Sequence, residues 1–270
     1  TNYLNNKKSF LPSKSCAIED LELNSNLTLV TIDSQWFLEN WDKHPTINDE
    51  CSIKTREDFF TELESILVKN QDKTVVLAVH HPLMSNGSHG GQFSLQKQLF
   101  PLEKKIPLPI IGSLINLIRK TSGISPQDLQ NKPYDLFTKR VKTLLQSHAN
   151  VIVVSGHDHN LQYLEKDNIK QIISGAGSKH EAAKAVFPND FSYGGYGFSK
   201  VEVFKDKSVL ITFYSTNEGQ LKKLHTHYIS KPDEYFNPNS SSYNLDTKVK
   251  ATIYTDDLTK KSKLYKFIWG

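Results

Sequence analysis

The chain has 270 residues, of which 37% are hydrophobic and 23% charged, as expected of a globular protein with a buried core. Its net charge of +4 is spread along the chain without a block of Lys or Arg, so we expect no nucleic-acid partner. No apolar run reaches the roughly 18 residues of a membrane-spanning helix. The chain opens on Thr1 without the pattern of a signal peptide, and we expect it to be a piece of a longer protein.

Apolar runs and amphipathic periodicity predict alternating strands and helices over the first two thirds of the chain. In chain order we expect a strand over 27–32, a long loop over 35–53, a helix over 55–69, a strand over 74–79, a helix over 134–147 and strands over 151–154 and 170–173. This alternation favours an α/β sheet, in which functional side chains lie in loops at the strand ends.

The pattern changes after Gly194, where three segments predict an antiparallel meander, over 197–204, 208–214 and 221–228. We therefore expect one main domain over 1–230, which includes an insertion over 100–133. A linker rich in Pro, Asn and Ser follows over 231–247. It leads to a following segment or domain over 248–270, which begins with a candidate strand.

One segment of the insertion, residues 106–118, is strongly apolar but interrupted by Pro and Gly. It is too short to span a bilayer as a helix. Either it packs on the core as an insertion helix, or it forms an exposed patch that lies at a membrane interface or docks a partner.

Cys16 and Cys51 are the two cysteines of the chain, and neither belongs to a C-x-x-C pair, which argues against a cysteine-based zinc site. They are either two buried free thiols or one disulfide, which requires an oxidising compartment.

Histidines follow two of the predicted strands. His157 and His159 come directly after the strand over 151–154, and in extended backbone two such residues project to the same side. His80 follows the strand over 74–79, and Pro82 favours an extended His81 that faces away from His80. If the two strands are neighbours in one sheet, His80, His157 and His159 converge on a metal site.

A further histidine, His89, lies in a glycine-rich loop over 85–91. It is either an ordinary surface residue or a functional one, which contacts the substrate or acts as a general acid.

The histidine segments resemble the motifs of purple acid phosphatases, within the calcineurin-like metallophosphoesterases. AVHHP at 78–82, followed by SNGSHG at 85–90, is similar to the family's Gly-His-x-Pro with a later His. GHDHNLQYL at 156–164 is similar to its Gly-His-x-His segment, and SGAG at 174–177 and GGYGF at 194–198 resemble later turns. The resemblance covers residues 20–228.

This resemblance implies a four-layer αββα sandwich of mixed β-sheets and a phosphomonoesterase with a dinuclear centre of Fe, Zn or Mn ions. His80 and His157 would bind one ion and His159 the other, with metal-bound hydroxide as the nucleophile. His89 would contact the phosphate or protonate the leaving oxygen.

The family's earlier motifs, Asp-x-His, Gly-Asp-x-x-(Asp or Tyr) and Gly-Asn-His-(Asp or Glu), are not recognisable in this sequence. We therefore expect an incomplete sandwich that carries the His-rich half of the site. The alternative is a catalytically incomplete interaction module. Residues 250–270 resemble the junction of bacterial metallophosphoesterases fused to an outer-membrane surface-antigen barrel. This resemblance implies a periplasmic or outer-membrane-associated location and a contact of residues 106–118 with an outer-membrane protein or a membrane surface.

Overall fold

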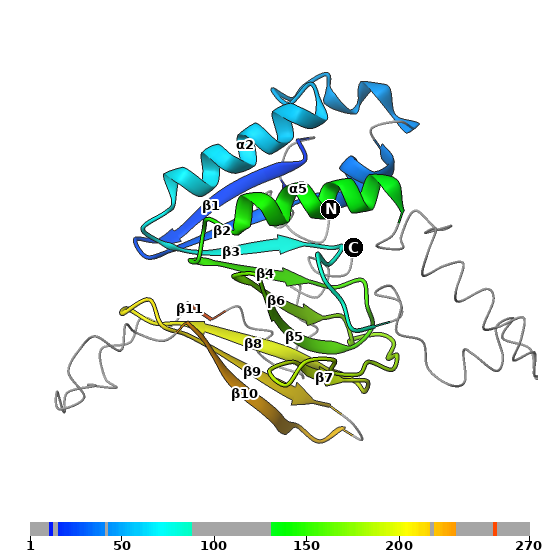
Figure 1. The fold of residues 1–270 in the computed structure, drawn as a ribbon, viewed down its shortest axis with the longest axis vertical. Coiled ribbons are helices and arrows are strands. Elements are labelled where there is room, and N and C mark those ends of the chain that lie inside the picture. Colours follow the sequence, from blue (N-terminus) through cyan, green and yellow to red (C-terminus); the bar gives the residue numbers. More distant parts are fainter. Residues whose placement is uncertain are drawn as a thin grey trace, which may run out of the picture.

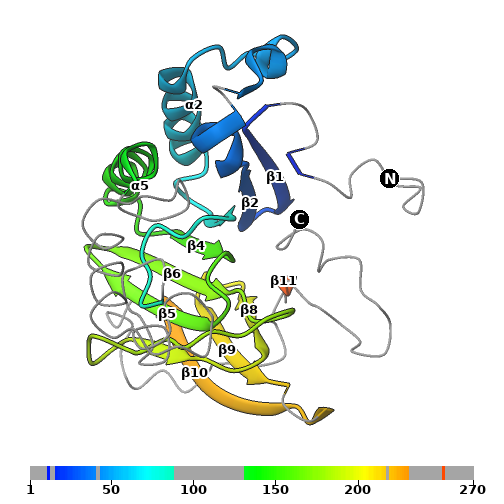
Figure 2. The same cartoon turned by 90° about the vertical axis from the view of Figure 1, so that its right-hand side faces the viewer.

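The computed structural model describes residues 11–12, 16–40, 43–87, 131–216, 219–230 and 251–252. These residues form three layers (Figures 1 and 2): two helices, a seven-stranded mixed sheet and a four-stranded antiparallel sheet. The predicted α/β class with mixed sheets is confirmed, and the three layers correspond to an incomplete αββα sandwich.

The seven-stranded sheet has the order β1-β2-β3-β4-β6-β5-β7. Its strands are β1 (Ile18–Asn24), β2 (Leu27–Ile32), β3 (Thr74–Val79), β4 (Val151–Ser155), β5 (Leu161–Lys166), β6 (Ile169–Ser174) and β7 (Phe191–Tyr193). The central strands β2, β3, β4 and β6 are parallel. Strands β3 and β4 are nearly continuous apolar runs because parallel strands are covered on both faces, whereas β6 also carries the buried Lys170 and Gln171.

The two helices, α2 (Arg56–Lys69) and α5 (Lys132–Leu145), cover one face of this sheet. A capping box starts α2, since Thr55 Oγ1 accepts from the Asp58 backbone N–H and the Asp58 carboxylate accepts from that of Thr55. Apolar side chains at helical spacing turn toward the sheet and form the first core, which includes Phe59, Leu63, Phe137, Val141 and, from the strands, Val75 and Leu77.

The second sheet has the order β10-β9-β8-β11 and lies on the opposite face of the first. Its strands are β8 (Gly197–Val203), β9 (Val209–Ser215), β10 (Lys222–Ser230) and β11 (Ala251–Thr252). A second core fills the space between the sheets, with Val76 and Ile152 from the first sheet against Val201, Ile211 and Phe213 from the second. Neighbouring residues of β3 thus serve different cores, because successive side chains point to opposite faces of the sheet.

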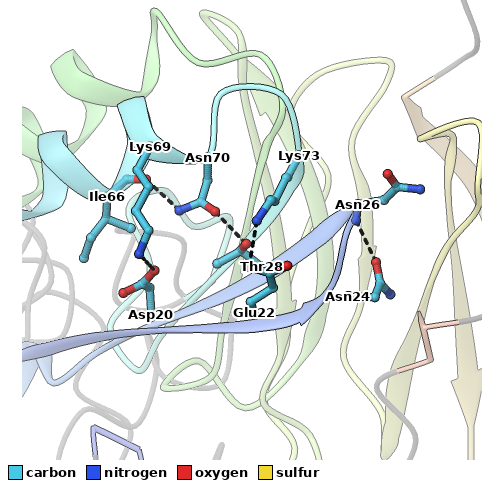
Figure 3. A network of polar contacts seen from close by, with 9 residues as sticks. All are labelled: Asp20, Glu22, Asn24, Asn26, Thr28, Ile66, Lys69, Asn70 and Lys73. Atoms are coloured by element: carbon cyan, nitrogen blue, oxygen red, sulfur yellow. Dashed lines mark hydrogen bonds and ion pairs between the residues drawn. The ribbon is translucent and has the colours of Figure 1, made fainter.

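A polar network fixes the end of α2 to the strands β1 and β2 (Figure 3). The Thr28 hydroxyl donates to Asn70 Oδ1 over 2.7 Å, and Asn70 Nδ2 donates to the Ile66 carbonyl over 2.9 Å. Lys69 pairs with Asp20 at 2.9 Å and Lys73 with Glu22 at 3.0 Å. The buried Asn70 side chain caps the end of α2, and the hydrogen bond from Thr28 holds this side chain in place.

The prediction of a loop over 35–53 is wrong in part. A short π-helix, η2 (Trp36–Asn40), and a 3-10 helix, η3 (Pro45–Asn48), lie in this segment. Trp36 and Phe37 are buried in the first core and contact Phe59, which explains why an aromatic segment without a period is ordered.

Cys16 and Cys51 form a disulfide, which settles the open alternative of free thiols. The bond connects the residues just before β1 to the segment that precedes α2. Both cysteines pack against the first core, so the disulfide holds the edge of the sheet to the helical layer.

Several predicted features lie outside the described residues: His89, the apolar segment 106–118, the linker over 231–247 and most of the insertion over 100–133. The predicted segment over 248–270 is described only at β11. In the described ranges, no helix combines the length and the hydropathy that crossing a membrane requires.

Candidate metal centre

The neighbouring parallel strands β3 and β4 bring two histidine loops together. Ala78 is paired with Val154, so the carboxyl ends of the strands lie side by side. His80 follows β3, and His157 follows β4 after Gly156. The Gly156 backbone N–H donates to the His80 carbonyl over 3.2 Å and fixes one loop to the other. This is the edge at which open α/β sheets place their sites.

Three histidines form a compact cluster at this edge. Each of His80, His81 and His157 offers one ring nitrogen, and these nitrogens all lie within 4.8 Å of one another. His157 Nδ1 and His80 Nε2 lie 3.3 Å apart. His81 and His157 are 2% and 9% exposed. Among the described residues, this is the one group of three His, Cys, Asp or Glu side chains arranged for an ion.

The spacing of this nitrogen pair fits a shared ion. Zinc binds imidazole nitrogen at about 2.0–2.1 Å in tetrahedral geometry, which places two ligand nitrogens about 3.3 Å apart. His157 Nδ1 and His80 Nε2 have this separation. Neutral imidazoles are suitable ligands for Zn, Fe and related metals. The residues present therefore fit a metal ion, both in the spacing of this pair and in the chemistry of three imidazoles.

The loop after β4 is not extended as we expected. His157 has φ of 64°, in the left-handed region that residues other than glycine rarely adopt, and the Asp158 N–H donates to the Gly156 carbonyl over 2.8 Å. The turn separates His157 from His159, which is not in the cluster and lies with Nδ1 3.9 Å from Glu181 Oε1. The assignment of His159 to a second ion stays a prediction.

His81 is a member of the cluster that the sequence did not indicate. Residues 80–81 lie in a bend rather than in extended backbone, so the expectation that the two neighbouring histidines face opposite ways is wrong. The rings of His80 and His81 meet edge to face, with centroids 4.9 Å apart. Ser34, two residues after the end of β2, lies with Oγ 2.7 Å from His81 Nδ1.

Two buried glutamines hold the loop that follows the cluster. Gln171 Oε1 accepts from the backbone N–H groups of Leu83 and Met84 over 3.0 and 2.9 Å, and Gln162 Oε1 accepts from that of Asn86 over 2.7 Å. Both glutamines are fully buried within strands. These two glutamines were not identified from the sequence. Their position within buried strands is the signal that could have found them, because buried polar groups need hydrogen-bond partners.

A close backbone approach shapes the loop that carries His157. A Cβ added to Gly175 would lie 1.9 Å from the Asp158 carbonyl oxygen, a distance that no side chain can occupy. The Asp158 side chain is fully buried and contacts the Ser85 hydroxyl. Gly175 in the turn after β6 therefore allows the loop over 156–160 to pack against the sheet.

Comparison with known proteins gives one match among curated sequences. The human tartrate-resistant acid phosphatase type 5 is 30% identical over 105 residues, which cover 35% of this chain and 32% of that enzyme. The chain thus matches about a third of the length of its curated relative. No protein-family model matches the chain.

Three solved structures resemble the chain in part. GAP50, the anchor in the inner membrane complex of Plasmodium, has a TM-score of 0.47 at 15% identity, covering 80% of this chain and 54% of that chain. PhoD has a TM-score of 0.43 at 11% identity, covering 79% of this chain and 44% of that chain. A 5'-nucleotidase from Staphylococcus aureus has a TM-score of 0.29 at 10% identity, covering 83% of this chain and 31% of that chain. TM-scores below 0.5 establish neither a shared function nor a shared site. The sequence match to an acid phosphatase supports the resemblance to calcineurin-like metallophosphoesterases that the motifs around His80 and His157 indicate.

Proposed function

We propose that the protein is a metal-dependent phosphohydrolase that acts on phosphomonoesters, and that His80 and His157 bind one of its metal ions. The observation that carries this proposal is the cluster of ring nitrogens at the carboxyl ends of β3 and β4. The match to an acid phosphatase supplies the reaction class.

Metal ions at such a site lower the pKa of water to near neutrality and stabilise the charge that develops on phosphoryl oxygens. The part of this chain is to place and orient the ion. The His157 loop is fixed by the close contact at Gly175, and the following loop over 82–87 is held by Gln162 and Gln171.

We extend the proposal to a second ion bound by His159, and to a contact of His89 with the phosphate or the leaving oxygen. His159 is at the same loop as His157 but outside the cluster, with its side chain 27% exposed. His89 lies outside the described residues. Three histidines can bind one ion with open positions, whereas a complete two-ion site requires oxygen ligands in addition.

We also propose an extracytoplasmic location, periplasmic or associated with an outer membrane. The Cys16–Cys51 disulfide supports this, because disulfides persist in oxidising compartments and are rare in the cytosol. The contact of residues 106–118 with a membrane or a protein stays a prediction, because the structure does not describe these residues. The fusion to a barrel also stays a prediction, because only β11 is described after residue 230.

The test is hydrolysis of p-nitrophenyl phosphate by the full chain loaded with Fe, Zn or Mn. His157→Ala removes one nitrogen of the 3.3 Å pair and should lower turnover by at least about 100-fold. The control is His44→Ala, which removes an exposed imidazole without a side-chain capping bond. Undiminished hydrolysis by His157→Ala would refute the assignment. Absence of hydrolysis by the loaded wild-type chain would favour the interaction-module alternative.

A further inference from the structure

The contact between Ser34 and His81 joins two strand ends at the histidine cluster. Strands β2 and β3 are parallel, and the last residues of each, Ile32 and Val79, are paired. Ser34 and His81 each lie two positions beyond these strand ends, and their side chains are in contact. Ser34 Oγ lies 2.7 Å from His81 Nδ1 and also accepts from the His81 backbone N–H over 3.4 Å.

Both partners of this contact are shielded from solvent. Ser34 is 0% and His81 is 2% exposed. The Tyr134 ring lies edge to face against His81, with centroids 5.4 Å apart, and its hydroxyl donates to the Pro82 carbonyl over 2.6 Å. Tyr134 thus holds both the bend and the imidazole. The His81 ring has one orientation because it is enclosed by Tyr134, Ser34 and His157.

This orientation directs His81 to the same centre as its neighbours. The His81 ring is tilted against that of His157, with centroids 4.5 Å apart, and a nitrogen of each ring belongs to the cluster within 4.8 Å. Histidines that bind metals usually donate their other ring N–H to an oxygen, which fixes the tautomer and the ring orientation. When His81 Nδ1–H donates to Ser34 Oγ, the lone pair lies on Nε2, as metal binding requires.

We propose that His81 supplies a third nitrogen ligand to the ion bound by His80 and His157, and that Ser34 is the positioning residue that orients His81. This inference rests on the proposed function only in requiring the ion. Three protein ligands with an open position are the arrangement of catalytic zinc-type sites. The competing interpretation makes His81 a purely structural residue, buried between Tyr134 and the cluster.

The test uses Co²⁺ as the probe, because its visible absorption reports the ligands directly. Co²⁺ affinity and spectrum are measured for the wild-type chain, Ser34→Ala, Ser34→Thr and His81→Gln. We expect Ser34→Ala to weaken binding by about 10–100-fold, as is usual when the oxygen partner of a metal-binding histidine is removed. His81→Gln should weaken it further and change the spectrum, and Ser34→Thr, which keeps the hydroxyl, should restore most of the affinity.

The matched control is Ser208→Ala, which removes another buried hydroxyl, 6% exposed and bonded to Asp206 between β8 and β9. It should leave Co²⁺ binding unchanged. Wild-type affinity and spectrum in both Ser34→Ala and His81→Gln would overturn the inference and leave the proposed function intact. A wild-type chain that binds no Co²⁺ would overturn both. Should His81→Gln fail to fold, the smaller change Ser34→Ala decides by affinity alone.

Discussion

Gly175 supports the metal centre because it has no side chain, which leaves room for the backbone carbonyl of Asp158. A methyl group there would meet backbone at 1.9 Å, which no rotamer change can relieve. Gly175→Ala must therefore displace the loop that carries His157. We expect a loss of about 1–3 kcal/mol in the free energy of unfolding, the usual effect of overpacking, together with weaker metal binding. Urea unfolding and a metal titration measure the two effects.

The control for Gly175→Ala is Gly219→Ala. Gly219 has φ of 73° and no atoms within 4 Å of an added Cβ, so the substitution strains only its own backbone. It should cost about 1–2 kcal/mol of stability and leave metal affinity unchanged. Equal effects of both substitutions on metal affinity would show that Gly175 does not support the site.

Single residues also mark the limit of prediction from sequence. His80 and His157 were predicted to converge because each follows an apolar strand, and the structure brings them to 3.3 Å. His81 was predicted to face away because Pro82 favours an extended backbone before it. The structure instead has a bend at 80–81, and the residue that contacts it, Tyr134, is distant in sequence. The turn at His157 needs a left-handed residue, which no local signal indicates at a histidine. Its support, Gly175, follows another strand.

At the scale of elements, His225 connects the two sheets. Its ring on β10 stacks on Phe191 of β7, with centroids 4.7 Å apart and planes at 6°, and the His227 ring lies 6.1 Å away. Burial lowers the pKa of His225 below the ordinary value of 6.5. The folded state therefore favours the neutral ring, which provides stability that is present above pH 6.5 and lost as the pH falls through the pKa of the folded state.

We predict that His225→Phe reduces this acid sensitivity. The substitution keeps an aromatic ring against Phe191 and removes the group whose protonation destabilises the packing of β10 on β7. The thermal midpoint of the metal-free chain should fall less between pH 7.5 and pH 5 in the variant than in the wild type. An equal fall in both proteins would show that His225 protonation does not contribute.

Strands with buried, apolar sequences were easier to predict than strands that are exposed, polar or short. Strands β2, β3 and β4 are apolar runs and were predicted within a residue of their bounds. Three strands were missed: β1 is acidic and partly exposed, β5 carries the buried Gln162, and β7 has only three residues. Each of them pairs with a neighbouring strand, and this pairing is not visible in the pattern of the segment itself. The same holds for η2, whose order comes from core contacts of Trp36 and Phe37.

At the scale of the whole molecule, the disulfide fixes the sheet edge to the helical layer. Cys16 and Cys51 are 35 residues apart. Closing a loop of this length lowers the conformational entropy of the unfolded chain and so raises its free energy by about 4 kcal/mol. We predict that the double substitution Cys16→Ser and Cys51→Ser lowers the free energy of unfolding by roughly 2–4 kcal/mol. Urea unfolding with and without reductant measures this.

Reductant should destabilise the wild-type chain to the level of the double variant and leave that variant unchanged. Two titratable thiols in the wild-type chain, unfolded without reductant, would contradict the bond and remove its support for an extracytoplasmic location.

The layers themselves were predictable only as a class. The pattern of the chain predicts an α/β sheet and an antiparallel meander, and only the family resemblance implies how they are layered; the structure has a helical layer and two sheets. Which faces meet depends on long-range pairings, such as Val76 against Ile211 between the sheets. The site follows from this arrangement, since the ends of β2, β3 and β4 bring Ser34, the neighbouring His80 and His81, and His157 to one edge.

The most direct test of the proposed metal site is elemental analysis of the purified full chain, beside His157→Ala, after incubation with Fe, Zn or Mn and removal of unbound ions. We predict at least one tightly bound ion per wild-type chain and its loss in His157→Ala, because that variant lacks one nitrogen of the His80–His157 pair. A wild-type chain without a bound ion, or an equal metal content in both proteins, would contradict the account.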